Sequence, residues 1–268
     1  MSETVVSKDA FVKDEALQQA RRQTRLWEVD TLRGVAIVLM VFFHFVWDLS
    51  YFGLYQANVL VGPWQTFARF IATLFIFVMG VSLTLSYNSE VRRSGQSPPF
   101  RKYFLRGLRI FGWGMVITVA TYFFVGRQFV IFGILHLLGL SIILAYPFLG
   151  LNKWISLAVG ILIIGAGIYV VEPLRSESAW FIWLGLKQVG RSMVDFYPVL
   201  PWFGVALIGV FAGYSLYPNG QRRYAWPDLG RVAPVRGLRF LGRHSLLIYL
   251  IHQPLLIGLF IVLGFGSI

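Results

Sequence analysis

Long apolar stretches follow one another along this chain of 268 residues, separated by short polar segments. A helix needs about 20 apolar residues to cross the roughly 30 Å of hydrocarbon in a bilayer. Inside lipid, only helices and closed barrels satisfy every backbone polar group. The pattern therefore predicts an all-α, polytopic membrane helix bundle of about seven transmembrane helices. We place them near 34–54, 64–86, 104–125, 129–149, 153–171, 199–217 and 241–265.

The composition supports a membrane protein and excludes several other classes. Hydrophobic residues make up 57% of the chain and charged residues 13%, whereas soluble domains have roughly 45–50% and about 25%. The net charge of +12 does not indicate a nucleic-acid partner, because the basic residues lie between the apolar stretches. The chain has no cysteine, which excludes disulfides and thiol chemistry.

The placement of Lys and Arg predicts the orientation. Cytoplasmic loops of membrane proteins are enriched in these residues. With the N-terminus inside, nineteen of the 24 Lys and Arg residues fall on the cytoplasmic side, and the C-terminus lies outside. We expect 1–25 to be a cytoplasmic segment forming a surface helix, and 26–268 to be a single transmembrane domain.

The first span carries a polar stripe. At 100° per residue, Asp30, Arg33, His44, Asp48 and Tyr51 point in nearly the same direction. Ionisable residues inside a membrane are costly unless they face the bundle interior, so they are functional candidates. At 1.5 Å per residue His44 lies about 16 Å from Arg33, near the middle of the bilayer. The alternative for His44 is a neutral imidazole that only hydrogen-bonds a neighbouring helix.

Other spans add polar candidates at comparable depth: Arg69, His136, Tyr249, His252 and Gln253. His252 is predicted at the depth of His44, and the three histidines can meet only if their helices adjoin. Arg69 is predicted at the depth of Asp48, so a buried ion pair joining the first two spans is the structural alternative to a catalytic Asp48. No two of the histidines share a helix at metal-ligand spacing, and we expect no metal.

Motifs for other chemistries are absent from the sequence. There is no G-x-S-x-G motif, no Walker A loop and no G-x-G-x-x-G motif. The outer loop before the sixth span carries Asp195 and Tyr197 together with Trp180 and Trp183. Such aromatic residues are typical of an interfacial belt, and carboxylates beside aromatics would also suit a sugar or another polar acceptor.

Several motifs resemble those of transmembrane acyltransferases, and most closely those of bacterial relatives of the heparan-α-glucosaminide N-acetyltransferase catalytic domain. The first is VDTLRGVAI at 29–37, followed by His44. The others are FIFVMG at 75–80, GILH at 133–136, YPVLPW at 197–202 and LGRHSLLIYLIHQP at 241–254. The resemblance covers most of the chain from residue 25.

The resemblance implies acyl transfer across a membrane, here the cytoplasmic (inner) membrane of a bacterium. Cytoplasmic acetyl-CoA would be the donor cosubstrate, and a polar acceptor on the other face, such as a sugar or glycan, would receive the acetyl group. Arg33 and His44 match the arginine and histidine of the family's first motif. The lysosomal enzymes carry a catalytic histidine before their second span, where this chain has Asn58, Val59 and Gly62.

With this resemblance, His44 and Asp48 are the predicted catalytic residues. The predicted donor-binding residues are Arg33, Arg92, Arg93, Arg101 and Arg239, which would hold the phosphates of CoA. Asp195 and Tyr197 are predicted on the acceptor side. Two alternatives stay open: a transporter or flippase that uses the polar stripe as a path, and a non-catalytic membrane subunit. Gly107, Gly112 and Gly114 permit close packing within one chain or in a homodimer.

Overall fold

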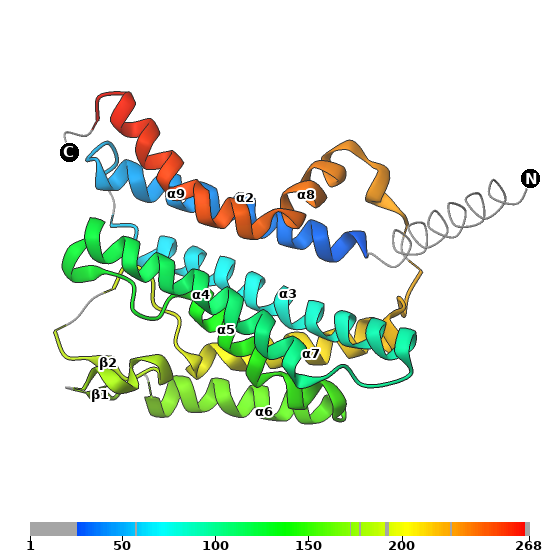
Figure 1. Cartoon of the computed structure of the whole chain (residues 1–268). Coiled ribbons are helices and arrows are strands. Elements are labelled where there is room, and N and C mark those ends of the chain that lie inside the picture. Colours follow the sequence, from blue (N-terminus) through cyan, green and yellow to red (C-terminus); the bar gives the residue numbers. More distant parts are fainter. Residues whose placement is uncertain are drawn as a thin grey trace, which may run out of the picture.

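The computed structural model is a bundle of helices whose axes run in roughly the same direction (Figure 1). It describes residues 26–56, 58–171, 173–176, 178–190, 193–225 and 227–265. The predicted surface helix at 1–25 lies outside this part of the chain. The main helices are α2 (Trp27–Tyr51), α3 (Gly62–Ser94), α4 (Phe100–Phe124), α5 (Ile134–Leu144), α6 (Lys153–Ala166), α7 (Val199–Leu216), α8 (Ala233–Arg243) and α9 (Ser245–Val262).

The predicted all-α membrane bundle is confirmed. Within the described residues, six helices are long and apolar enough to cross a membrane, and α5 is a shorter apolar helix. α2 begins at one end of the bundle and α9 finishes at the other (Figure 1). We call these the near end, where α2 begins, and the far end, where α2 finishes. Which end faces the cytoplasm stays a prediction.

Short elements join the main helices. A π-helical turn, η3 (Gly167–Val171), continues α6. Strands β1 (Arg175–Ser176) and β2 (Lys187–Gln188) pair in parallel at the far end. The 3-10 helices are η1 (Gly126–Gln128), η2 (Tyr146–Gly150), η4 (Ala179–Leu184), η5 (Pro218–Gly220) and η6 (Leu229–Arg231).

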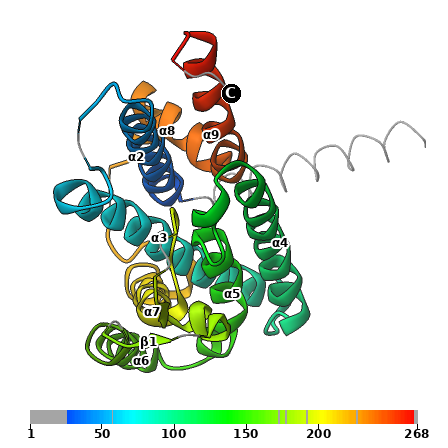
Figure 2. The ribbon, with the colours of Figure 1, turned by 90° about the vertical axis from the view of Figure 1, so that its left-hand side faces the viewer.

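The core lies where α3, α5 and α7 meet. Ile76, Leu137 and Leu207, one from each of these helices, are fully buried in the same cluster. Viewed along the bundle, α6 lies outside α7, α4 lies outside α5, and α2 lies on the other side of α3 (Figure 2). Helices α8 and α9 pack on α2, so α2 is held between α3 and the last two helices.

Three details of the predicted topology are wrong. The fourth span, predicted at 129–149, is an α-helix only over Ile134–Leu144, because residues 129–133 are not helical and the 3-10 helix η2 follows. The last span, predicted at 241–265, is two helices that meet at His244. The short connections at 125–129 and 149–153 also predict that the third, fourth and fifth spans pack as successive neighbours, whereas α4 packs on α5 but α6 packs along α7.

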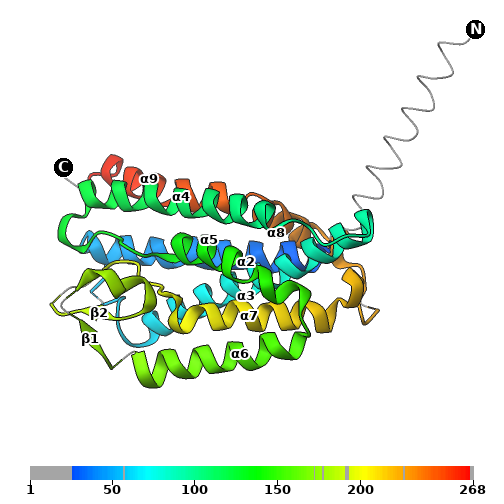
Figure 3. The same ribbon diagram turned by 60° about the horizontal axis from the view of Figure 1, so that its bottom comes forward.

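Helices α2 and α8 approach each other through glycines. A Cβ added at Gly34 would collide with the backbone oxygen of Leu238, and one at Gly242 would collide with that of Asp30. Small residues allow such close approach in membranes, where packing rather than the hydrophobic effect joins helices. Gly107 and Gly114 of α4 likewise lie against Gly139 and His136 of α5. They therefore allow close helix packing within one chain. Figure 1 shows α8 and α9 next to α2, and Figure 3 shows α6 and α7 side by side on the other side of the bundle.

We predict that Gly34→Ala lowers thermal stability, because the added methyl forces the backbones of α2 and α8 apart. Overpacking of this kind costs about 1–3 kcal/mol. The matched control is Gly237→Ala, since a Cβ at Gly237 of α8 meets nothing within 4 Å and alanine favours a helix by about 1 kcal/mol. Unfolding midpoints in detergent measure both variants. Equal midpoints would contradict the close approach.

Candidate active site

Charged side chains form a chain of ion pairs across α2 and α8 at the near end. The Arg33 guanidinium lies 3.2 Å from Asp30 and donates to the Ser82 hydroxyl of α3 at 2.7 Å. Asp30 also accepts from Arg243 of α8 at 3.2 Å. Arg106, which is exposed on α4, acts electrostatically on Arg33. Asp30 and Arg33 of the first motif thus contact α8 and α3, respectively.

His44 and His252 meet where α2 lies beside α9. Their ring centroids are 4.7 Å apart and the rings are nearly perpendicular, at 77°. The prediction that they lie at similar depth is therefore confirmed. His252 is 8% exposed and its Nε2 has no hydrogen-bond partner. His44 is partly exposed.

Asp48 lies one turn beyond His44 on α2 and is fully buried. Its Oδ1 accepts a hydrogen bond of 2.7 Å from the Gln253 amide of α9, while Oδ2 has no partner. The alternative of an ion pair between Asp48 and Arg69 is not formed, because Gln253 supplies the donor and Arg69 is exposed near the start of α3. Tyr51, the last residue of the predicted stripe, is 69% exposed and stacks on Trp47.

His136 lies apart from this pair. Its Nδ1 accepts from the Gly133 amide at 3.2 Å, which satisfies a backbone donor at the start of α5. The ring packs against Phe111 and Phe132, and its Nε2 lies 3.3 Å from the Thr118 hydroxyl. Two of the three intramembrane histidines therefore meet, and the third caps its own helix.

Asp195 and Tyr197 lie in the segment before α7. The Asp195 carboxylate accepts from the Ile134 amide at 3.1 Å, at the positive end of α5. Burial raises the pKa of Asp195 to about 6, and the Ile134 amide works in the opposite direction. Burial and the charge of Asp195 raise the pKa of Tyr197. Asp195 also acts electrostatically on Tyr249, whose ring centroid is 5.8 Å from that of His252.

The predicted donor-binding arginines occupy two places. Arg92, Arg93 and Arg101 are exposed where α3 ends and α4 begins. Arg92 donates to the backbone oxygen of Asn219, and Arg93 pairs with Glu90 at 3.0 Å. Arg239 instead lies on α8 and donates to the Gly230 backbone oxygen at 2.8 Å.

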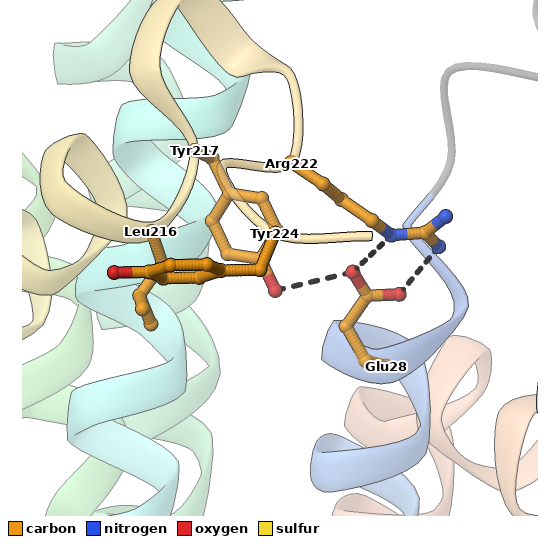
Figure 4. Close-up of a pocket in the computed structure, with 5 residues that line it drawn as sticks. All are labelled: Glu28, Leu216, Tyr217, Arg222 and Tyr224. Atoms are coloured by element: carbon orange, nitrogen blue, oxygen red, sulfur yellow. Dashed lines mark hydrogen bonds and ion pairs between the residues drawn. The ribbon is translucent and has the colours of Figure 1, made fainter. Parts of the chain in front are cut away.

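A further contact at the near end was not predicted from the sequence. Glu28 of α2 binds Arg222 through two hydrogen bonds of 2.8 Å and accepts from the Tyr217 hydroxyl at 3.2 Å (Figure 4). Leu216 and Tyr224 complete the lining of this small pocket. Glu28 raises the pKa of Arg222. No spacing pattern signals the contact, since Glu28 and Arg222 lie on segments far apart in sequence.

The geometry defines a membrane-embedded site with a cationic end and a pair of imidazoles. No three His, Asp or Glu side chains converge as metal ligands within the described part of the chain. The family model for "Heparan-alpha-glucosaminide N-acetyltransferase, catalytic" matches residues 25–254. The chain therefore belongs to this family of membrane acetyltransferases, as its motifs predicted. No curated protein matches the sequence at a significant level.

We predict that Asp195→Asn raises the unfolding temperature at pH 7.5. A carboxyl whose pKa is raised on folding favours the protonated state, so the wild type loses stability as pH rises from about 4 to about 6. Asparagine keeps an oxygen for the Ile134 amide without the buried charge. The difference between variant and wild type should shrink as pH falls from 7.5 towards 4. A difference that does not change with pH would contradict the account.

Proposed function

We propose that the protein transfers an acetyl group from acetyl-CoA, bound at the near end, to a polar acceptor that enters from the far end. The observation that carries the proposal is the placement of Arg33 and His44 on one face of α2. They are separated by 11 residues, or about 16 Å of helix. An extended pantetheine arm can bridge such a distance between the phosphates of CoA and its thioester.

His44 is the general base in this proposal. The acceptor's amine or hydroxyl attacks the thioester carbonyl while its proton passes to His44 Nε2. The new bond to carbon forms, the carbon–sulfur bond breaks, and the CoA thiolate takes the proton from His44. An imidazole suits this role because its ordinary pKa lies near operating pH. The partial exposure of His44 supports access by both substrates.

The near-end cations bind the donor. CoA phosphates prefer guanidinium groups, which donate two parallel hydrogen bonds. Arg33 and Arg106 interact with each other electrostatically from α2 and α4, so an anion between them would relieve their repulsion. Arg92, Arg93 and Arg101 lie further out and would attract the donor by charge. Arg239 is a weaker candidate, because it already holds the Gly230 carbonyl.

Asp195 and Tyr197 are proposed to contact the acceptor at the far end. The acetylated group would then lie near Tyr249 and the two imidazoles. Asp48 is proposed as a positioning residue, which fixes α9 beside α2 through Gln253. The near end is the cytoplasmic one in this account, as the Lys and Arg placement predicts, and the membrane is the bacterial inner membrane. A carbohydrate is the acceptor class that the resemblance suggests.

The donor site is tested by thermal stability with acetyl-CoA. A ligand that binds only the folded state raises the unfolding midpoint by mass action. We predict that Arg106→Gln weakens binding about tenfold, or about 1.4 kcal/mol, because one charge-assisted contact to phosphate is lost. The matched control is Arg127→Gln, which removes an exposed far-end cation of η1.

The outcomes separate the candidate functions. Acetyl-CoA should stabilise the wild type and Arg127→Gln equally, and Arg106→Gln less. Equal weakening by both variants would mean a general charge effect instead of a near-end site. No stabilisation of the folded wild type at saturating acetyl-CoA would overturn the acyltransferase proposal and favour a transporter or a structural subunit.

A further inference from the structure

The two imidazoles at the contact of α2 and α9 have a fixed tautomer. His44 Nδ1 lies 2.9 Å from the Met40 backbone oxygen, and His252 Nδ1 lies 2.7 Å from that of Tyr249. A carbonyl oxygen can only accept a hydrogen bond, so each Nδ1 must carry a hydrogen. Each neutral ring therefore presents an unprotonated Nε2. The two rings are in edge-to-face contact.

Two acceptors cannot hydrogen-bond each other. His252 Nε2 is buried without a donor, and a buried polar atom without a partner costs free energy. A single proton removes this cost, because it turns one Nε2 into a donor while the other stays an acceptor. The resulting N–H···N hydrogen bond is charge-assisted and therefore strong. Rings whose centroids are 4.7 Å apart can reach this hydrogen bond by rotating out of their edge-to-face arrangement.

We infer that His44 and His252 form a proton-binding site that holds one proton between their Nε2 atoms. The site has one proton and not two, because a second would place two positive charges on adjacent rings. It is also distinct from a metal centre, since the described residues offer no third ligand.

Other titratable groups lie around the two rings on each neighbouring element. Asp48 lies one turn from His44 on α2, and its carboxylate is bound by Gln253. Tyr249 on α9 packs beside His252, and Asp195 and Tyr197 act on it electrostatically. On α3, the apolar residues Phe67, Ile71 and Phe75 pack against this part of α2, and Arg69 acts electrostatically on Tyr197. His244, which has the same Nδ1 contact to a backbone oxygen, is exposed at the break between α8 and α9, where its ring packs on Phe240.

In the proposed reaction, on which this use of the site rests, the acceptor's proton would stay inside the bundle. It would leave the attacking amine or hydroxyl, bind between the two Nε2 atoms, and pass to the CoA thiolate when the carbon–sulfur bond breaks. His252 would then be a positioning residue that stabilises the protonated form of His44. The proton-binding site itself requires neither acetyl-CoA nor the substrate that receives the acetyl group, so it can be tested separately.

The test is NMR spectroscopy of the protein in detergent with histidine labelled by ¹⁵N in the ring. The chain has only four histidines, so single replacements assign every signal. At high pH, we expect Nδ1–H tautomers for both His44 and His252. On acidification the two sets of signals should change together, over one pH interval, with uptake of one proton for the pair.

Independent uptake of two protons by the pair would overturn the inference, as would uptake of none before unfolding. This result comes from the wild type and does not depend on any variant folding. His252→Phe adds a second test: His44 should then take up its proton less readily, because phenylalanine keeps a ring at this position but has no lone pair to accept a hydrogen bond. His244→Phe is the matched control and should leave His44 unchanged. If acetyl-CoA fails to bind while the pair takes up one proton, the result contradicts the proposed function and supports the proton-binding site.

Discussion

The polar face of α2 is the constraint on which the rest of the structure depends. In hydrocarbon, no water satisfies a charged or hydrogen-bonding side chain, so each needs a protein partner. Helices α8 and α9 supply these partners along most of α2: Arg243 for Asp30, His252 beside His44, and Gln253 for Asp48. Because the last two helices cover this face, the N-terminal motif and the C-terminal motif form one site.

The glycine of the first motif makes this arrangement possible. Gly34 lets the backbone of α8 approach α2 closely, and Gly242 of α8 lets the backbone of α2 approach α8. This approach brings Arg243 to Asp30, which in turn holds Arg33. The break between α8 and α9 at His244 then redirects the chain, and α9 continues beside the far half of α2. Packing at the near end and the imidazole pair in the middle are thus consequences of the same helix contact.

The number of spans could be predicted from the sequence because length and hydropathy are set by bilayer thickness. The short length of α5 could not be predicted, because the start of this helix depends on Asp195, 61 residues away, and on His136 binding the Gly133 amide. The depth of His44 and His252 followed from helix rise. Their contact did not, because spacing along one chain does not say which helices adjoin. For the same reason, the sequence offered Arg69 as a possible partner of Asp48, whose partner in the structure is Gln253.

The central claim is that His44 is the base that allows acetyl-CoA to react with an acceptor. It is tested most directly by release of the CoA thiol from acetyl-CoA with glucosamine as the acceptor probe. The chain has no cysteine, so the protein adds no thiol signal. Loss of a general base lowers a rate by about 10²–10⁴, so His44→Ala should bind acetyl-CoA but release thiol at least about a hundredfold more slowly than wild type. Equal release by both proteins would contradict the account.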